Sequence, residues 1–252
     1  MAMSTSCCLK SFAWEGTPSG RVDKLGAIDC YVAGGDNHDK PAILFIHDAL
    51  GWTFPNARLL ADHYAHEADA TVYVPDFFGG EALPFEPILA GRFHEVDFAG
   101  FLGRNTREIR EPEIFDAARL LRERHKNVGA VGFCYGGWAC LRLGAKQHNQ
   151  HRLVDCVSIG HPSLLTKRDI DEVAVPVQML APEHDPVYTA ELKMHTFQTL
   201  PNAGVYFDYL HLPGMEHGCL VRGDPKVLGE REAMARAKNA AVGWFRMFLH
   251  EN

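Results

Sequence analysis

The stretch from Val128 to Ala139 constrains this chain more than any other. It opens with an apolar run of the length of a buried strand and ends in a small-residue run that is typical of a helix. Between the two lies Gly132-Phe133-Cys134-Tyr135-Gly136, the pattern of a sharp strand-to-helix turn that presents a nucleophile, here a thiol. Side chains at the two glycines would collide with neighbouring elements. We therefore predict that Cys134 ends a strand and precedes a helix whose dipole favours the thiolate, the alternative being a buried structural cysteine.

The composition is that of a soluble globular protein. The chain has 252 residues, 46% hydrophobic and 23% charged, which is enough for the core of one large domain. A net charge of −7 argues against nucleic acid or an anionic membrane as a partner. No apolar run approaches the roughly 20 residues that span a bilayer, and the first residues do not have the pattern of a secretion signal.

The cysteines and histidines suggest a reducing compartment and no metal site. Seven cysteines, an odd number, are scattered without any C-x-x-C pair, which predicts a cytoplasmic protein without a disulfide framework. The fourteen histidines show neither H-x-x-x-H nor H-E-x-x-H spacing, and no glycine-rich nucleotide motif is present. We therefore expect neither a metal nor a nucleotide cofactor.

Strand-like and helix-like segments alternate along the chain. The helix after Cys134 is expected to end near 149. Other strands are expected at 27–33, 42–46, 71–74, 154–159, 175–180 and 205–210, and other helices near 58–68, 112–125, 189–199 and 225–249. No linker or repeat divides the chain. This pattern predicts an α/β fold in a single domain, 1–252, with a mostly parallel sheet covered by helices on both faces.

Two segments do not fit the alternation. Residues 1–24 are polar and irregular, and we expect an N-terminal arm there, which includes the pair Cys7-Cys8. Residues 81–110 contain prolines, aromatic residues and arginines, and are long for a plain connection, so they are expected to form a lid or a pocket wall. Pro112 is then expected in the first turn of the following helix.

Polar residues follow successive strands at the edge where α/β proteins bind ligands. Cys134 is followed by Asp185 and then by His217, each in a loop after a strand, and nucleophile–acid–histidine is the chain order of α/β-hydrolases. His217 would take the thiol proton, Asp185 would orient His217, and a thioester intermediate would form and be hydrolysed. Asp185 could instead be a turn former and His217 an ordinary loop histidine, and Glu183 and Glu216 are neighbouring carboxylates that we rank lower.

An oxyanion formed in this reaction needs two N–H donors. The backbone N–H of Tyr135, directly after the nucleophile, is one. The other is expected from the loop after the early buried strand, at Ala49.

At these residues the chain resembles the dienelactone hydrolase family. The resemblance is carried by the sequence 132–137, the Glu183-His184-Asp185 loop, His217-Gly218 and Asp48-Ala49-Leu50-Gly51. It is similar to the fungal branch in its cysteine-pair start, in Trp14-x-Gly16-Thr17-Pro18 and in the His-Pro pair after the turn helix. The resemblance implies an α/β-hydrolase fold and hydrolysis of a cyclic enol-lactone or related ester by Cys134, Asp185 and His217, without a metal or organic cofactor.

The resemblance also implies roles for other residues. Asp48 matches a glutamate that controls the ionisation of the thiol in bacterial members, although it is one methylene shorter and could be only a loop carboxylate or a cap. Arginines bind the lactone carboxylate in the bacterial enzymes, and Arg222 and Arg92 are candidates here that could equally be surface or structural residues. His161 and Trp52 could line the pocket, or could be a backbone-bonded histidine and a packed aromatic residue.

Other functions remain open on the sequence alone. A thioesterase or carboxylesterase acting on polyketide-type products would share the same motifs, because the pocket is built from loops. A ligand-binding protein that keeps the fold without turnover is the alternative outside enzymes. In each case the expected partner is a small molecule, and the chain is expected to be a monomer or a homodimer.

Overall fold

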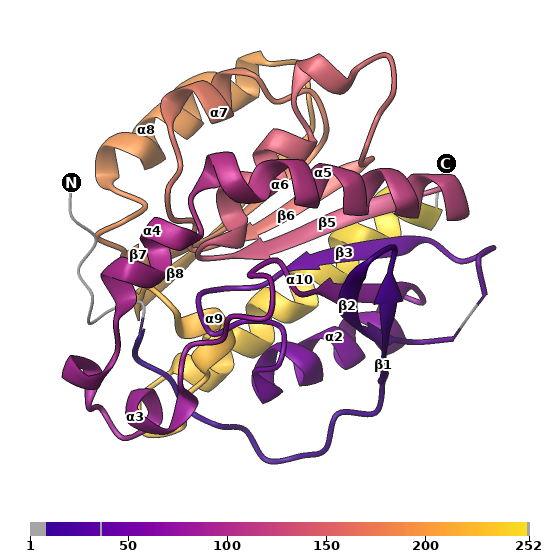
Figure 1. The fold of residues 1–252 in the computed structure, drawn as a ribbon. Helices are drawn as coiled ribbons and strands as arrows, with labels where there is room; N and C mark the ends of the chain where they lie inside the picture. Colours follow the sequence, from indigo (N-terminus) through magenta and orange to yellow (C-terminus); the bar gives the residue numbers. More distant parts are fainter. Residues whose placement is uncertain (1–8, 36, 251–252) are drawn as a thin grey trace.

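An eight-stranded sheet forms the centre of the molecule (Figure 1). The computed structural model describes residues 9–35 and 37–250. The strand order is β1-β2-β4-β3-β5-β6-β7-β8, with β3 to β8 parallel and β2 antiparallel to both β1 and β4. The strands are β1 (Arg21–Leu25), β2 (Ile28–Ala33), β3 (Ala42–Ile46), β4 (Thr71–Pro75), β5 (Val128–Phe133), β6 (Cys156–Gly160), β7 (Val177–His184) and β8 (Phe207–Glu216). The predicted α/β fold with a mostly parallel sheet is confirmed.

Helices cover both faces of this sheet (Figure 1). On one face lie α2 (Pro55–Glu67), α9 (Cys219–Arg222) and α10 (Glu230–His250), and on the other α5 (Arg107–Arg124), α6 (Gly136–Leu143), α7 (Lys167–Asp171) and α8 (Ala190–Thr199). The short helices are α3 (Phe85–Leu89), α4 (Phe98–Arg104) and three 3₁₀ turns, η1 (Phe93–Glu95), η2 (Lys146–His148) and η3 (Leu200–Asn202). Because of this double cover, every residue of β3, β4, β5 and β6 is buried, which explains their continuous apolar sequences.

The N-terminal arm is shorter than expected. Residues 21–24, assigned to an irregular arm, belong to β1, which pairs with β2 across a turn at Gly26. β1 is an edge strand with three exposed central residues, Val22, Asp23 and Lys24, so it has little of the apolar alternation by which strands are recognised. Cys7-Cys8 lies outside the described residues.

The segment 81–110 contains α3, η1, α4 and the beginning of α5. α5 begins at Arg107, so the prediction that Pro112 opens this helix is wrong, and Pro112 lies inside it. The guanidinium of Arg107 binds Asp169, and that of Arg110 binds Glu113 and the carbonyl oxygen of Phe78. The contacts of Arg107 with Asp169 and of Arg110 with Phe78 are tertiary, and they hold the extra turn although the proline cannot supply the N–H that would bond within it.

Four other boundaries differ clearly from the predicted ones. α6 ends at Leu143 and not near 149, because Gly144 caps it, and α10 begins at Glu230 and not at 225. β7 and β8 are longer than expected and reach His184 and Glu216, so that the residue after each strand stands at the sheet edge. Within the described residues, no helix has both the length and the apolar character needed to cross a membrane.

Candidate active site

Cys134 lies between the end of β5 and the beginning of α6, with a backbone φ of 50°, in the left-handed region that is unusual for a residue with a side chain. A Cβ atom at Gly132 would lie 2.3 Å from the carbonyl oxygen of Gly136, and one at Gly136 would lie 2.1 Å from that of Ile46. Both positions therefore require glycine, for the reason expected from the sequence. The strained turn carries the sulfur to the sheet edge.

The main chain of Cys134 is held by the last residue of β6 and by the segment that follows it. Its N–H donates to the carbonyl oxygen of Gly160 at 3.1 Å, and its own carbonyl oxygen accepts from the N–H of Ser163 at 2.8 Å. The Sγ atom lies 3.6 Å from the Oγ atom of Ser163, within hydrogen-bond distance for sulfur. The two loops thus form one hydrogen-bonded unit.

Asp185 and His217 follow β7 and β8 directly. Both carboxylate oxygens of Asp185 lie 3.0 Å from Nδ1 of His217. Nε2 of His217 is buried and bonded to no nitrogen or oxygen of the described residues, and the sulfur of Cys134 acts on this imidazole by charge and by hydrogen bonding. The exposed fractions of Cys134, Asp185 and His217 are 4%, 7% and 1%, so the three groups meet in a site screened from bulk water.

The electrostatics favour a charged imidazole beside a charged carboxylate. Burial lowers the pKa of His217, but Cys134 and Asp185 together raise it well above the usual value for histidine. Burial raises the pKa of Asp185, yet His217 and the backbone N–H groups of Tyr188 and Val187 bring it below the usual range. Asp185 therefore stays ionised and can stabilise an imidazolium.

The neighbouring carboxylates are used elsewhere. Glu183 accepts a hydrogen bond from the N–H of Gly214 at 2.7 Å, and Glu216 forms an exposed ion pair with Lys10 at 3.0 Å. Asp185 is the carboxylate placed against the imidazole of His217.

Asp48 lies in the loop after β3, where its Oδ1 atom accepts the N–H of Leu50 at 2.9 Å. Burial, and then the nearby charge of Cys134, raise the pKa of Asp48 to about 7. The carboxyl group is therefore within electrostatic reach of the sulfur, which the sequence left open.

The two expected N–H donors lie in adjacent loops. Ala49 follows β3 and Tyr135 follows Cys134, and β3 pairs with β5 in parallel, with Ile46 opposite Gly132. Within the part of the chain that the structure describes, neither backbone N–H is engaged in a hydrogen bond. Both are thus available to a ligand.

The other residues singled out from the sequence divide into two groups. His161 is fully buried against His217, with ring centroids 4.9 Å apart, and both its ring nitrogens are without partners among the described residues. Trp52 lies beside the loop of Asp48, packed on the core and covered by the guanidinium of Arg58 at 4.8 Å. His161 therefore lies against the imidazole of His217, whereas Trp52 packs on the core under Arg58.

The two candidate arginines are already paired with carboxylates. Arg222 in α9 is buried and forms a bidentate ion pair with Glu230, with bonds of 2.7 and 2.5 Å. Its Nη1 atom has no hydrogen-bond partner among the residues that the structure describes. It also lines a cavity of about 380 Å³ next to the end of β8. Arg92, nearer the surface, binds Glu86 and Glu95.

Ser163 was missed by the sequence reasoning, although it stands in contact with the sulfur. It is 1% exposed and comes directly after the His-Pro pair that had been noticed. A small polar residue after a central strand was the available signal.

A comparison with protein-family models decides the family. The model described as the dienelactone hydrolase family matches residues 28–249. This chain belongs to the dienelactone hydrolase family. As a member it is a hydrolase of carboxylic esters or lactones.

Curated relatives agree with the dienelactone hydrolase assignment. The hydrolase tropI of Talaromyces stipitatus is 27% identical over 254 residues, which cover 98% of each chain. The hydrolase pyvD of Aspergillus violaceofuscus is 27% identical, with 97% of each chain covered. The human carboxymethylenebutenolidase homolog is 27% identical over 210 residues, covering 81% of this chain and 80% of that protein.

Solved structures show the same fold. A dienelactone hydrolase-like promiscuous phosphotriesterase from metagenomic libraries superimposes with a TM-score of 0.66 at 19% identity, covering 92% of this chain and 98% of that one. Carboxyl esterase 2 from the mycorrhizal fungus Tuber melanosporum gives a TM-score of 0.66 at 13% identity, covering 96% of this chain and 91% of that one. The α/β-hydrolase fold predicted from the sequence is thereby confirmed.

Proposed function

We propose that this dienelactone hydrolase-family protein cleaves a lactone or carboxylic ester with Cys134 as the nucleophile, His217 as the general base and acid, and Asp185 as the residue that orients His217. The observation that carries the proposal is the meeting of the three groups. The sulfur is presented on a left-handed backbone beside an imidazole whose far nitrogen is fixed by a carboxylate at 3.0 Å. Burial of all three groups strengthens their mutual interaction.

The proposed acylation step uses these groups in turn. The thiol proton moves to Nε2 of His217, and the thiolate attacks the carbonyl carbon of the bound ester. The charge that develops on the carbonyl oxygen is stabilised by the N–H groups of Ala49 and Tyr135, which no other group occupies in the described structure. His217 then protonates the leaving oxygen, which leaves a thioester on Cys134.

Water completes the cycle. His217, again neutral, takes a proton from water as it attacks the thioester carbon, and the proton returns to the departing thiolate. Asp185 stays ionised throughout and stabilises the imidazolium in both halves of the reaction, consistent with its lowered pKa.

Asp48 fits the role that the family resemblance suggested. With a pKa of about 7, its carboxyl group changes charge near neutral pH, and its negative form opposes a thiolate at Cys134. His161 is proposed to line the substrate site through its contact with His217, and Trp52 to lie at the margin. Arg222 and Arg92 remain candidates for contact with a substrate carboxylate, and in this structure each forms an ion pair with a glutamate. The proposed substrate is a small neutral or anionic ester.

Replacing the nucleophile tests the proposed function. Cys134→Ala removes only a sulfur atom, and we expect it to abolish hydrolysis of small lactones and aryl esters, by at least 10³-fold in kcat/KM, while the fold is kept. The measurement is steady-state hydrolysis of a substrate panel by purified full-length protein, with circular dichroism to follow the fold. Cys140→Ala, at a buried cysteine in α6, is the matched control and should retain turnover. Undiminished hydrolysis by Cys134→Ala would refute the assignment.

A further inference from the structure

The last residue of β6 and the loop that joins it to α7, residues 160–166, which we call the β6 turn, are strained and packed against the sulfur. Two of its non-glycine residues have a left-handed backbone conformation, His161 with a φ of 36° and Leu164 with a φ of 57°. Strain of this kind persists only where the surroundings hold it, and it is concentrated at functional sites. The β6 turn supplies the acceptor for the N–H of Cys134 and the donor for its carbonyl oxygen.

This hydrogen bonding fixes where the Ser163 side chain can lie. Its backbone N–H is bound to the carbonyl oxygen of Cys134, so its hydroxyl is carried to the same residue, 3.6 Å from Sγ. Ser163 is 1% exposed, so this contact is shielded from bulk water. A hydroxyl can donate to a thiolate or accept from a thiol, and the charged form gives the stronger bond.

We propose that Ser163 is a further catalytic residue, whose hydroxyl donates a hydrogen bond to the Cys134 thiolate and so increases the fraction of thiolate near neutral pH. The inference rests on the proposed role of Cys134 as the nucleophile. In each half of the reaction the sulfur alternates between a thiolate and a thioester, and the hydroxyl bonds more strongly to the thiolate. No proton leaves Ser163 in this scheme.

The other groups around the sulfur make such a donor useful. Asp48, from the loop after β3, opposes the thiolate when it is ionised, and His217, from the loop after β8, favours it. His161 is buried beside His217, and burial followed by the charge of His217 lowers its pKa well below the usual value, so it stays neutral. Ser163 thus supplies stabilisation that does not itself change with pH.

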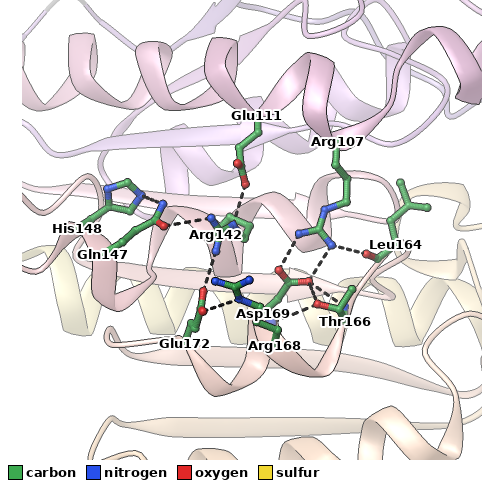
Figure 2. A network of polar contacts seen from close by, with 10 residues as sticks. All are labelled: Arg107, Glu111, Arg142, Gln147, His148, Leu164, Thr166, Arg168, Asp169 and Glu172. Atoms are coloured by element: carbon green, nitrogen blue, oxygen red, sulfur yellow. Dashed lines mark hydrogen bonds and ion pairs between the residues drawn. The ribbon is translucent and has the colours of Figure 1, made fainter.

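An ion-pair clamp holds the β6 turn in place (Figure 2). Nη1 of Arg107 donates to the carbonyl oxygen of Leu164 at 2.8 Å, and the guanidinium binds both oxygens of Asp169 at 2.9 and 2.7 Å. The same Asp169 caps α7 by accepting from the N–H and hydroxyl of Thr166 at 2.8 and 2.7 Å. These contacts attach α5 to the C-terminal end of the β6 turn, at Leu164 and Thr166, and so hold Ser163 beside the sulfur.

The test is the pH dependence of alkylation at Cys134. The full-length protein is treated with iodoacetamide over a range of pH, and peptide mass spectrometry measures the rate at residue 134. For Ser163→Ala we expect the midpoint to rise by about one pH unit, which corresponds to about tenfold less thiolate at neutral pH, with the same plateau at high pH. Hydrolysis should fall by about the same factor near neutral pH and recover at alkaline pH.

The matched control is Ser158→Ala. Ser158 is a fully buried serine of β6 whose hydroxyl donates to Gln178 at 2.8 Å. Its replacement removes a buried hydroxyl from the strand that precedes the β6 turn and leaves the contact with the sulfur in place. Its alkylation curve should follow the wild type. Ser163→Thr, which restores a hydroxyl, should return the midpoint toward the wild-type value.

Superimposable alkylation curves for Ser163→Ala and the wild type would overturn the proposal. If Ser163→Ala does not fold, Ser163→Gly also removes the hydroxyl, and its midpoint must then lie above that of the wild type. The result is independent of turnover, because alkylation is measured on the sulfur itself. Hydrolysis that survives in Cys134→Ala would remove the proposed function, whereas unchanged alkylation in Ser163→Ala would remove only the role of Ser163.

Discussion

The Asp48 carboxyl and the Cys134 thiol are two acids placed together in a buried site. Each opposes the ionisation of the other, and burial adds to the effect, so the pKa of Asp48 is raised to about 7. The imidazole of His217 acts in the opposite sense on both groups. The charge on the sulfur near neutral pH is therefore decided by a few neighbours of opposite effect.

Asp48→Asn should make the thiol easier to ionise. The amide keeps an oxygen for the N–H of Leu50 but has no negative charge above pH 7, so the opposition to the thiolate is lost. We expect the midpoint of iodoacetamide alkylation at Cys134 to fall by about one pH unit. Asp76→Asn, at a buried carboxylate after β4 that binds the N–H groups of Phe78 and Gly80, is the control and should leave the curve in place. An unshifted curve for Asp48→Asn would exclude the carboxylate from control of the thiol.

At the scale of elements, the site is built from loops that follow five parallel strands. Each of these loops carries one residue of the site. They follow β3, β5, β6, β7 and β8, and carry Asp48, Cys134, His161, Asp185 and His217 in that order. Parallel pairing brings the C-terminal ends of these strands to one edge of the sheet. The β6 turn is fixed to α5 through Arg107, which binds the carbonyl oxygen of Leu164 and forms a partly buried ion pair with Asp169 of α7. A substitution in this ion pair therefore tests how much the attachment of the β6 turn to α5 contributes to the free energy of unfolding.

Removing the carboxylate of this clamp should be costly. Asp169→Asn leaves the partly buried guanidinium of Arg107 without its counter-charge and weakens the cap of α7, so we expect a loss of about 2–4 kcal/mol in the free energy of unfolding. Urea denaturation measures it. Arg168→Gln, which breaks the exposed pair of Arg168 with Glu172 in the same helix, should change stability by less than about 1 kcal/mol. Equal effects of the two variants would show that the clamp does not stabilise the turn.

Features that depend on neighbours along the chain could be predicted from the sequence. The buried strands have continuous apolar runs, and Cys134 lies in a local motif, so β3, β5 and the turn at Cys134 were found. Features that depend on contacts between distant residues were not. β1 owes its existence to pairing with β2, the first turn of α5 to Arg107, and the contact of Ser163 with the sulfur to residues 29 positions apart.

At the scale of the whole molecule, a buried ion pair between Arg222 and Glu230 joins α9 to the beginning of α10. Arg222 follows the loop of His217, and Glu230 opens α10, the long helix that packs under the sheet (Figure 1). Their side chains are 6% and 1% exposed, and Oε1 of Glu230 also accepts the N–H of Asp224. The position of His217 is therefore coupled to the packing of α10.

Glu230→Gln should destabilise the protein strongly. A neutral amide leaves the buried guanidinium of Arg222 uncompensated, and breaking such a pair costs about 3–5 kcal/mol. The shift of the urea midpoint measures the loss. Glu232→Gln, at an exposed position of the same first turn of α10, should change the free energy of unfolding by less than about 0.5 kcal/mol. A similarly small shift for Glu230→Gln would mean that water or structural relaxation compensates the arginine.

The double attachment of Cys134 to the β6 turn limits how this protein can change over evolution. Because the amide and the carbonyl of Cys134, the proposed nucleophile, are both bound to that turn, a residue altered there to admit another substrate would also disturb the sulfur. New substrate preferences are thus expected to arise in segment 81–104, where exposed ion pairs such as Arg104 with Glu81 can be exchanged at little cost. Selectivity and reactivity would then be inherited through separate parts of the chain.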